Sequence, residues 1–127
     1  MAKIFNGTPH PINIVANAVF QIDIRKYVVP DGIEPQIAAS IPSNGVLSAK
    51  IDTVDGGNID GIPVFTKNIA GCDTLPDGHD IYIVSQLYVS AARACGIDTS
   101  KLYTVADPVY TSDGRTILGS RGICPAF

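Results

Sequence analysis

The side chains of this sequence best suited to bind an anion are its four arginines. Two of them, Arg115 and Arg121, share parity on the extended segment predicted for the end of the chain. Their spacing along a strand separates them by about 20 Å at ~3.3 Å per residue, which is too far for both to grip one phosphate. They would instead hold opposite ends of a large anion, or two ligands at a subunit boundary, unless they are simply solvated strand side chains.

An aromatic ring near such arginines would complete a nucleotide site, because bases stack on aromatic side chains. Tyr88, on the helix predicted below, is the candidate for this role. The alternative is that the Tyr88 ring belongs to the hydrophobic core.

Patterns that would indicate catalysis or metal binding are absent from the sequence. No serine lies in a Gly-x-Ser-x-Gly elbow, and there is no Gly-Lys-Ser/Thr phosphate loop. Cys72 and His79 are only two potential ligands, whereas a zinc site needs three or four. Five aspartates stand directly before a glycine, where the carboxylate serves the backbone of a turn. We therefore expect no enzyme activity, no metal, no cofactor and three reduced cysteines.

The composition predicts a single β-rich domain over residues 1–127. A chain of 127 residues with 46% apolar residues is large enough to bury a core. Its 17 isoleucines and 11 valines stand against 5 leucines, and β-branched residues favour strands. The net charge of −3 lacks the basic footprint of a DNA or RNA binder. No segment approaches the ~20 apolar residues of a membrane span.

The predicted fold class is α+β, mostly β: a small antiparallel sheet domain with one or two helices. The main helix spans 86–95, since Ser85 is a good N-cap and Gly96 suits a left-handed C-cap. Alternating apolar and polar residues predict that 19–29 is one antiparallel strand paired with 12–15. Turn residues predict that Asp55–Asn58 ends a strand begun at 46, that 68–80 is a loop, and that Asp113-Gly114 turns a terminal hairpin.

Five ordered pieces of the sequence carry a resemblance to a known family. They are Asn6–Ile14, Gly61–Val64, Leu75-Pro76, Tyr82–Ser85 and Asp113–Gly119. Together they resemble the nucleotide-sequestering phage anti-defence proteins, or sponges, of the anti-Thoeris type and their anti-CBASS relatives. The likeness covers most of the chain, although residues 16–40 find no place in it.

The resemblance implies binding without turnover. A β-rich protomer with a helix would assemble as homodimers, often as hexamers, and capture cyclic immune signalling nucleotides in the cytoplasm of the infected bacterium. Family ligands include glycocyclic ADP-ribose and, in some members, cyclic di- or trinucleotides. Family sites use an aromatic ring for the base and arginines for the phosphates. The matching ligand-binding positions here are Tyr88, Arg115 and Arg121, with Arg93 and Arg25 as further candidates.

Two other interpretations stay open at this point. A small virion or assembly protein would also lack catalytic patterns. An enzyme of an unrecognised type would use residues that none of the known catalytic patterns identifies. The low content of lysine and glutamate leaves little charged surface to keep a monomer soluble, so we expect a closed homo-oligomer under either binding or assembly.

Overall fold

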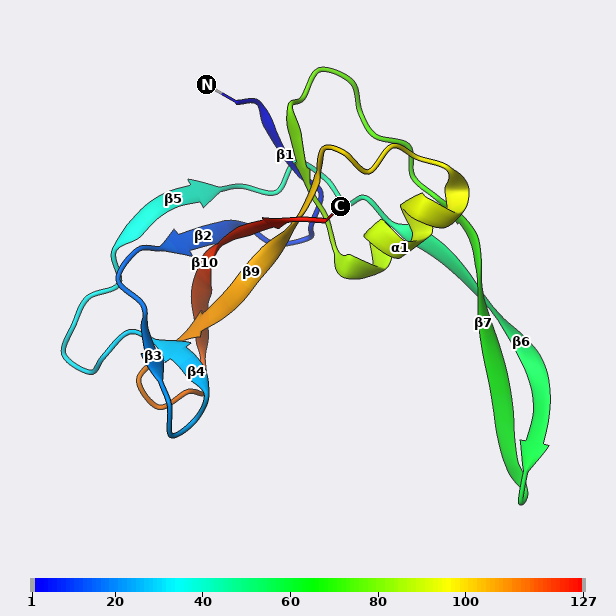
Figure 1. Cartoon of the computed structure of the whole chain (residues 1–127), viewed down its shortest axis with the longest axis horizontal. Helices are drawn as coiled ribbons and strands as arrows, with labels where there is room; N and C mark the ends of the chain where they lie inside the picture. Colours follow the sequence, from blue (N-terminus) through cyan, green and yellow to red (C-terminus); the bar gives the residue numbers. More distant parts are fainter. Residues whose placement is uncertain (1, 127) are drawn as a thin grey trace.

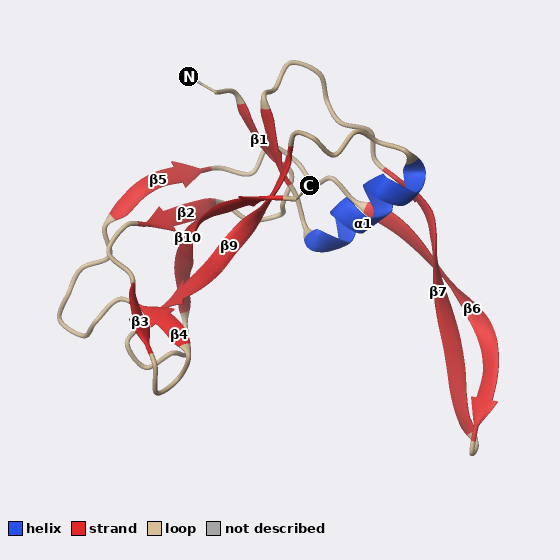
Figure 2. Cartoon of the chain, viewed as in Figure 1, coloured by secondary structure: helices blue, strands red, loops and turns tan. Residues whose placement is uncertain are grey.

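The computed structural model describes residues 2–126 and confirms the α+β, mostly β class (Figures 1 and 2). Strands make up about half of the chain, and the described residues contain one α-helix. The elements are β1 (Ile4–Asn6), β2 (Ile12–Val15), β3 (Val19–Gln21), β4 (Lys26–Val28), β5 (Ile37–Ile41), β6 (Ala49–Ile59), β7 (Ile62–Cys72), β8 (Ile81–Ile83), α1 (Gln86–Cys95), β9 (Leu102–Tyr110) and β10 (Ile117–Pro125).

The main sheet is mixed rather than purely antiparallel. Its strand order is β1-β8-β9-β10-β2-β5, and the β3–β4 hairpin joins it through β4, which runs parallel to β9. The β1–β8, β8–β9 and β10–β2 pairs are also parallel, whereas β9–β10 and β2–β5 are antiparallel. This arrangement places the β3–β4 hairpin beside the β9–β10 hairpin, at one end of the sheet (Figure 1).

The helix predicted at 86–95 is confirmed with both of its caps. Ser85 has extended backbone angles, and its hydroxyl accepts a hydrogen bond from the Tyr88 amide at 3.2 Å. Gly96 ends the helix in the left-handed conformation, at φ 76°, which a residue with a Cβ adopts at a cost. The buried face of α1 packs on the strands that precede and follow it, in a core of Leu47, Tyr82, Val84, Tyr88, Val89, Ala92 and Leu102.

A second, smaller core lies under the β3–β4 hairpin. It consists of Val15, Val29 and Val109, with Tyr27 and Leu118 packed against it. α1 packs on one end of the sheet and the β3–β4 hairpin extends the sheet at the other, and the described residues form two separate buried clusters. Packing against this smaller core fixes the position of the Tyr27 side chain.

The buried side chain of Asn6 ties three segments together. Its amide nitrogen donates to the backbone oxygens of His10, at 2.9 Å, and Ile41, at 3.1 Å. Its side-chain oxygen accepts from the backbone amide and the hydroxyl of Thr8. An unsatisfied buried amide is costly, so these bonds fix the turn after β1 against the end of β5. The first piece of the sequence resemblance therefore has a structural role here.

The predicted strand over 19–29 is wrong. The chain turns at Ile22–Arg25, so that β3 pairs with β4, and β2 pairs instead with β5 and β10. Arg25 closes the turn with φ 53°, and its amide donates to the Ile22 oxygen at 3.3 Å. A left-handed residue interrupts an extended strand, and nothing in the apolar alternation reports it.

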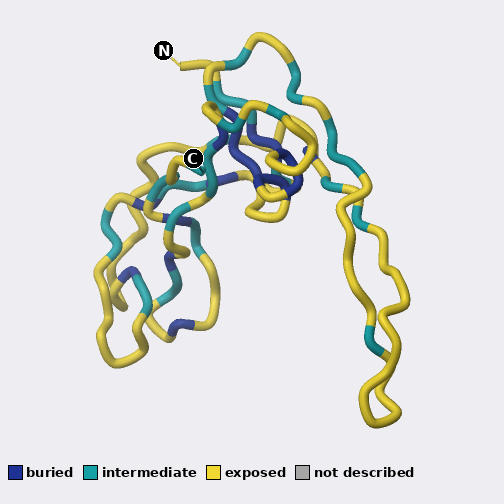
Figure 3. Tube along the Cα trace, turned by 45° about the vertical axis from the view of Figure 1, so that its right-hand side comes forward, coloured by how far each residue is buried: buried dark blue, intermediate teal, exposed yellow. Residues whose placement is uncertain are grey.

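The predicted strand end at Asp55–Asn58 is also wrong. β6 continues through these residues, which form a β-bulge opposite β7, and the chain turns only at Asp60-Gly61. β7 in turn extends to Cys72, into the segment predicted as a loop. The result is a two-stranded hairpin, residues 49–72, which we call the arm. It projects away from the rest of the molecule and is exposed along almost its whole length (Figures 1 and 3).

Candidate functional site

A cleft of about 350 Å³ opens between the β3–β4 hairpin and β9. We call it the cationic cleft. It is lined by Phe20, Arg25, Lys26, Tyr27, Asp107, Pro108 and Tyr110. Its aromatic and basic side chains come from two hairpins that are distant in sequence, and the parallel pairing of β4 with β9 brings them together.

Arg121 lies beside the cationic cleft and contacts two of its residues. The guanidinium carbon is 4.1 Å from the centroid of the Tyr27 ring. The same guanidinium donates to Asp107 across the β9–β10 ladder, with 3.0 Å between Nη1 and Oδ2. Both charged side chains are about half exposed, at 46% and 53%. Arg121 is thus held in place over the Tyr27 ring while part of its surface still faces solvent.

Lys26 is oriented in a similar way on the other side of Tyr27. Its ammonium lies 4.5 Å from the centroid of the Tyr110 ring and donates to the Gly114 oxygen at 3.0 Å. The Phe20 ring completes the aromatic group, edge-on to Tyr27 with 5.1 Å between centroids. This end of the sheet therefore carries three aromatic rings and two cation–ring contacts, Arg121 on Tyr27 and Lys26 on Tyr110.

Two residues of the cationic cleft have strained backbones. Among the described residues, three that are not glycine have positive φ, and two of these, Arg25 at 53° and Asp107 at 21°, line the cleft. Such conformations cost of order 1–3 kcal/mol and concentrate at functional sites. The strain at Arg25 sets the turn that carries its side chain to the cleft, and the strain at Asp107 accompanies its pairing with Arg121.

The structure brings three of the predicted arginines to this end of the molecule. Arg25 lines the cationic cleft and Arg121 flanks it. Arg115 is exposed and follows Gly114, whose oxygen binds the Lys26 ammonium. Asp113 fixes the turn before Arg115 by accepting from the Arg115 amide at 3.0 Å. Its hydrogen bonds from Thr111 and from this amide lower the pKa of the Asp113 carboxyl.

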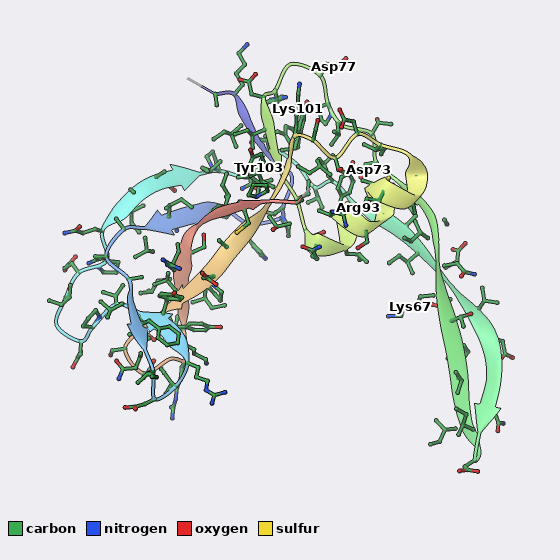
Figure 4. The ribbon with its side chains drawn as sticks, viewed as in Figure 1. Lys67, Asp73, Asp77, Arg93, Lys101 and Tyr103 are labelled. Carbon is green, nitrogen blue, oxygen red and sulfur yellow. The ribbon has the colours of Figure 1, made fainter. Side chains whose placement is uncertain are left out.

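Tyr88 and Arg93 lie elsewhere, which corrects the prediction that they join the site. Tyr88 is fully buried in the main core, and its hydroxyl donates to the Asp73 oxygen at 2.5 Å. Burial raises the pKa of Tyr88 to about 12. The ring has no exposed face on which a base could stack. Arg93 lies on α1, where its guanidinium donates to the Ala126 oxygen (Figure 4).

Sequence reasoning missed Phe20, Lys26, Tyr27 and Tyr110. The adjacent Arg25-Lys26-Tyr27 was the available signal, because basic residues next to an aromatic ring are typical of nucleotide contacts. Interpreting 19–29 as one strand hid that signal, because alternate residues of a strand point to opposite faces and Lys26 is then separated from Arg25 and Tyr27.

A second hollow, which we call the apolar groove, lies on the other side of Pro108. It has a volume of about 320 Å³ and walls that are predominantly apolar. It is lined by Thr8, His10, Pro11, Ile12, Asn13, Val105, Pro108, Ile117, Gly119 and Ser120. Its composition suits apolar side chains rather than an anion.

Within residues 2–126, no three His, Cys, Asp or Glu side chains are grouped so that they could hold a metal ion. None of the helices in that range has the length and hydrophobicity of a membrane span. Comparison with protein-family models, curated proteins and solved structures gives no match for this chain. The family resemblance therefore stays a prediction, and the geometry of the cationic cleft is the structural basis for a function.

Proposed function

We propose that this protein binds an anionic nucleotide in the cationic cleft and holds it without cleaving it. The observation that carries the proposal is the grouping of Arg25, Lys26 and Arg121 around one exposed and two half-buried aromatic rings in a chain of net charge −3. An acidic protein repels anions at long range, so a local cluster of cations with aromatic neighbours is best explained by an anionic aromatic ligand.

The chemistry of the cleft suits such a ligand. Guanidinium groups bind phosphate through two parallel hydrogen bonds, and an ammonium binds it as a point charge. Arg121 already lies over Tyr27, and Phe20 and Tyr110 offer further ring surface for a base. The Arg121–Asp107 ion pair is half exposed and therefore weak. A phosphate can replace Asp107 as the partner of Arg121 at little cost.

The class of ligand follows from the sequence resemblance. Cyclic immune signalling nucleotides, such as glycocyclic ADP-ribose or a cyclic oligonucleotide, combine bases with closely spaced phosphates. Sequestration in the cytoplasm of an infected bacterium needs neither a catalytic group nor a cofactor, and the ligand rather than DNA would be the partner.

Calorimetric titration of glycocyclic ADP-ribose and cyclic di- and trinucleotides against the purified protein tests this proposal. We expect one of them to bind, and Arg25→Ala or Arg121→Ala to weaken that binding by about 10- to 100-fold, since a charge-assisted hydrogen bond contributes roughly 1.5–3 kcal/mol. Arg93→Ala is the matched control and leaves affinity unchanged. Equal affinity in all three variants would place the site elsewhere.

Recovery of the ligand separates binding from turnover. The complex is incubated, denatured by heat, and the released nucleotide is identified by mass spectrometry. A sequestering protein returns the nucleotide intact, whereas an enzyme returns a product.

The arm favours a second candidate function, a small virion or assembly protein. Large apolar side chains are exposed along it, as expected for a segment that contacts another protein. A protein that associates with itself yet binds none of the nucleotides would support this alternative.

A further inference from the structure

The arm is a hairpin whose base packs against α1 and whose outer part has no support from the rest of the described chain. β6 and β7 pair only with each other, and an isolated two-stranded sheet is marginally stable in water. Large apolar side chains nevertheless project from it into solvent. Ile62 is 65% exposed and Phe65 is 59% exposed, and these two lie on opposite faces of β7. The exposed large apolar residues of the arm are Val54, Ile59, Ile62, Phe65 and Ile69.

A single copy of the chain exposes more surface than a compact monomer of its mass. The accessible area is 8095 Å². A compact monomer of 13.4 kDa exposes about 6,500 Å², so this chain exposes about 1,600 Å² more. A standard protein interface covers about 800 Å² on each partner. The excess is therefore as large as the surface that each subunit of an extensive, permanent dimer buries.

The apolar groove is the surface on the same chain that matches the arm. Three of its apolar wall residues, Val105, Pro108 and Ile117, are exposed, with Ile117 at 61%. Its volume of about 320 Å³ accommodates one or two large apolar side chains. The arm, with strands of 11 residues, reaches about 36 Å at ~3.3 Å per residue. That length is enough to extend across a neighbouring copy.

From these observations we infer that the arm of one copy lies in the apolar groove of a second copy of the same chain. The face of the arm that carries the paired residues Ile59 and Ile62 supplies the side chains that fill the groove. Both surfaces belong to every copy, so two copies that exchange arms form a closed pair in which both arms and both grooves are occupied. Pro108 lines both the groove and the cationic cleft, so a seated arm lies along the edge of the cleft.

The outer edges of the arm are poorly suited to pair with a further strand. We therefore expect the arm to contact the second copy through its side chains. Pro63 has no amide hydrogen to donate, and two β-bulges distort the ladder, one of them at Asp55–Asn58. Proline, charge and bulges on an edge strand prevent pairing with further strands. The arm thus offers apolar side chains while avoiding open-ended association.

Sedimentation equilibrium of the full chain at micromolar concentration tests the inference. The wild type has a mass of at least twice 13.4 kDa. An arm variant, Ile59→Asp with Ile62→Asp, and a groove variant, Ile117→Asp, each lose at least half of the wild-type mass. Leu87→Asp, which places the same charge on an exposed residue of α1, keeps it. A monomeric wild type, or equal dissociation by Leu87→Asp, overturns the inference.

Mixing the two dissociated variants identifies the contact directly. The arm variant retains an intact groove and the groove variant an intact arm, so the mixture forms a complex that contains both. Arm-to-arm or groove-to-groove association gives no such rescue and overturns the inference. All substituted residues are exposed, and a retained thermal transition in each variant shows that the fold persists.

Discussion

At the scale of single residues, Tyr88 is an aromatic side chain that the sequence predicts in the binding site and that the structure places in the core. Tyr88→Phe removes the hydrogen bond to the oxygen of the half-buried Asp73, which costs about 0.5–1.5 kcal/mol. Tyr88→Ala leaves a cavity and costs about 3–5 kcal/mol. Urea unfolding measures both losses. The Tyr88→Phe protein binds nucleotide as tightly as the wild type, and a tenfold weaker affinity would return Tyr88 to the site.

Arg121, unlike Tyr88, lies beside the cationic cleft, and we expect its positive charge alone to be insufficient for nucleotide binding. Its planar guanidinium both covers the Tyr27 ring and pairs with Asp107. An ammonium cannot reproduce that fork, so Arg121→Lys weakens nucleotide binding by about 10-fold although the charge is kept. Arg93→Lys, measured in the same titration, leaves it unchanged. Full affinity in Arg121→Lys would mean that the ligand contacts only the charge.

The three thiols differ in reactivity because they differ in burial. Cys95 and Cys124 are exposed, whereas Cys72 packs against the main core. Burial, and then the neighbouring Cys95 thiol, raise the pKa of Cys72 to about 11. The thiolate is the reactive form, and at pH 8 Cys72 holds about a thousandth of its thiol in that form. Iodoacetamide therefore modifies Cys95 and Cys124 first, and the Cys72 rate increases about tenfold for each pH unit up to about 11. Peptide mapping that finds Cys72 modified first would contradict this order.

At the scale of elements, the sequence predicted what local chemistry determines. Helix 86–95 was predictable because its caps, Ser85 and Gly96, act within a few residues of the chain. The turn at Ile22–Arg25 was not, because it contains neither glycine nor proline and Arg25 nevertheless adopts a left-handed conformation. The same failure hid half of the candidate site. Arg25, Arg115 and Arg121 were found as charges, but the aromatic rings between them depend on strand pairing that the pattern does not specify.

The contact between β2 and β10 depends on a single glycine. A Cβ on Gly119 would lie 2.3 Å from the Asn13 oxygen, so Gly119→Ala forces the two strands apart. Overpacking of this kind costs about 1–3 kcal/mol. Gly122→Ala, on the same strand, is the matched control because its Cβ would meet nothing within 4 Å. Urea unfolding of both proteins measures the difference, and equal midpoints would mean that β10 shifts to accommodate the methyl group.

At the scale of the whole molecule, the two ends of the structure have different chemistry. One end carries the cationic cleft, and the arm at the other end carries exposed apolar residues with little net charge (Figure 1). Pro108 connects the cleft to the groove in which an arm would lie. The proposed nucleotide binding and the inferred self-association therefore use adjacent surfaces, and we expect substitutions to separate the two.

The rate of limited proteolysis reports whether the arm is exposed or covered in the assembled protein. Lys67 lies on the exposed part of β7, away from the rest of the chain (Figure 4). A protease cleaves a segment when it opens locally, and an unsupported hairpin opens easily. Trypsin therefore cuts after Lys67 rapidly in the groove variant Ile117→Asp, because its arms no longer lie in the groove of a second copy. It cuts slowly in the wild type. Dilution of the wild type below its dissociation constant increases the rate of this cut, whereas the cut in the variant is independent of concentration. Equal rates in both proteins at every concentration would show that the arm stays exposed in the assembly.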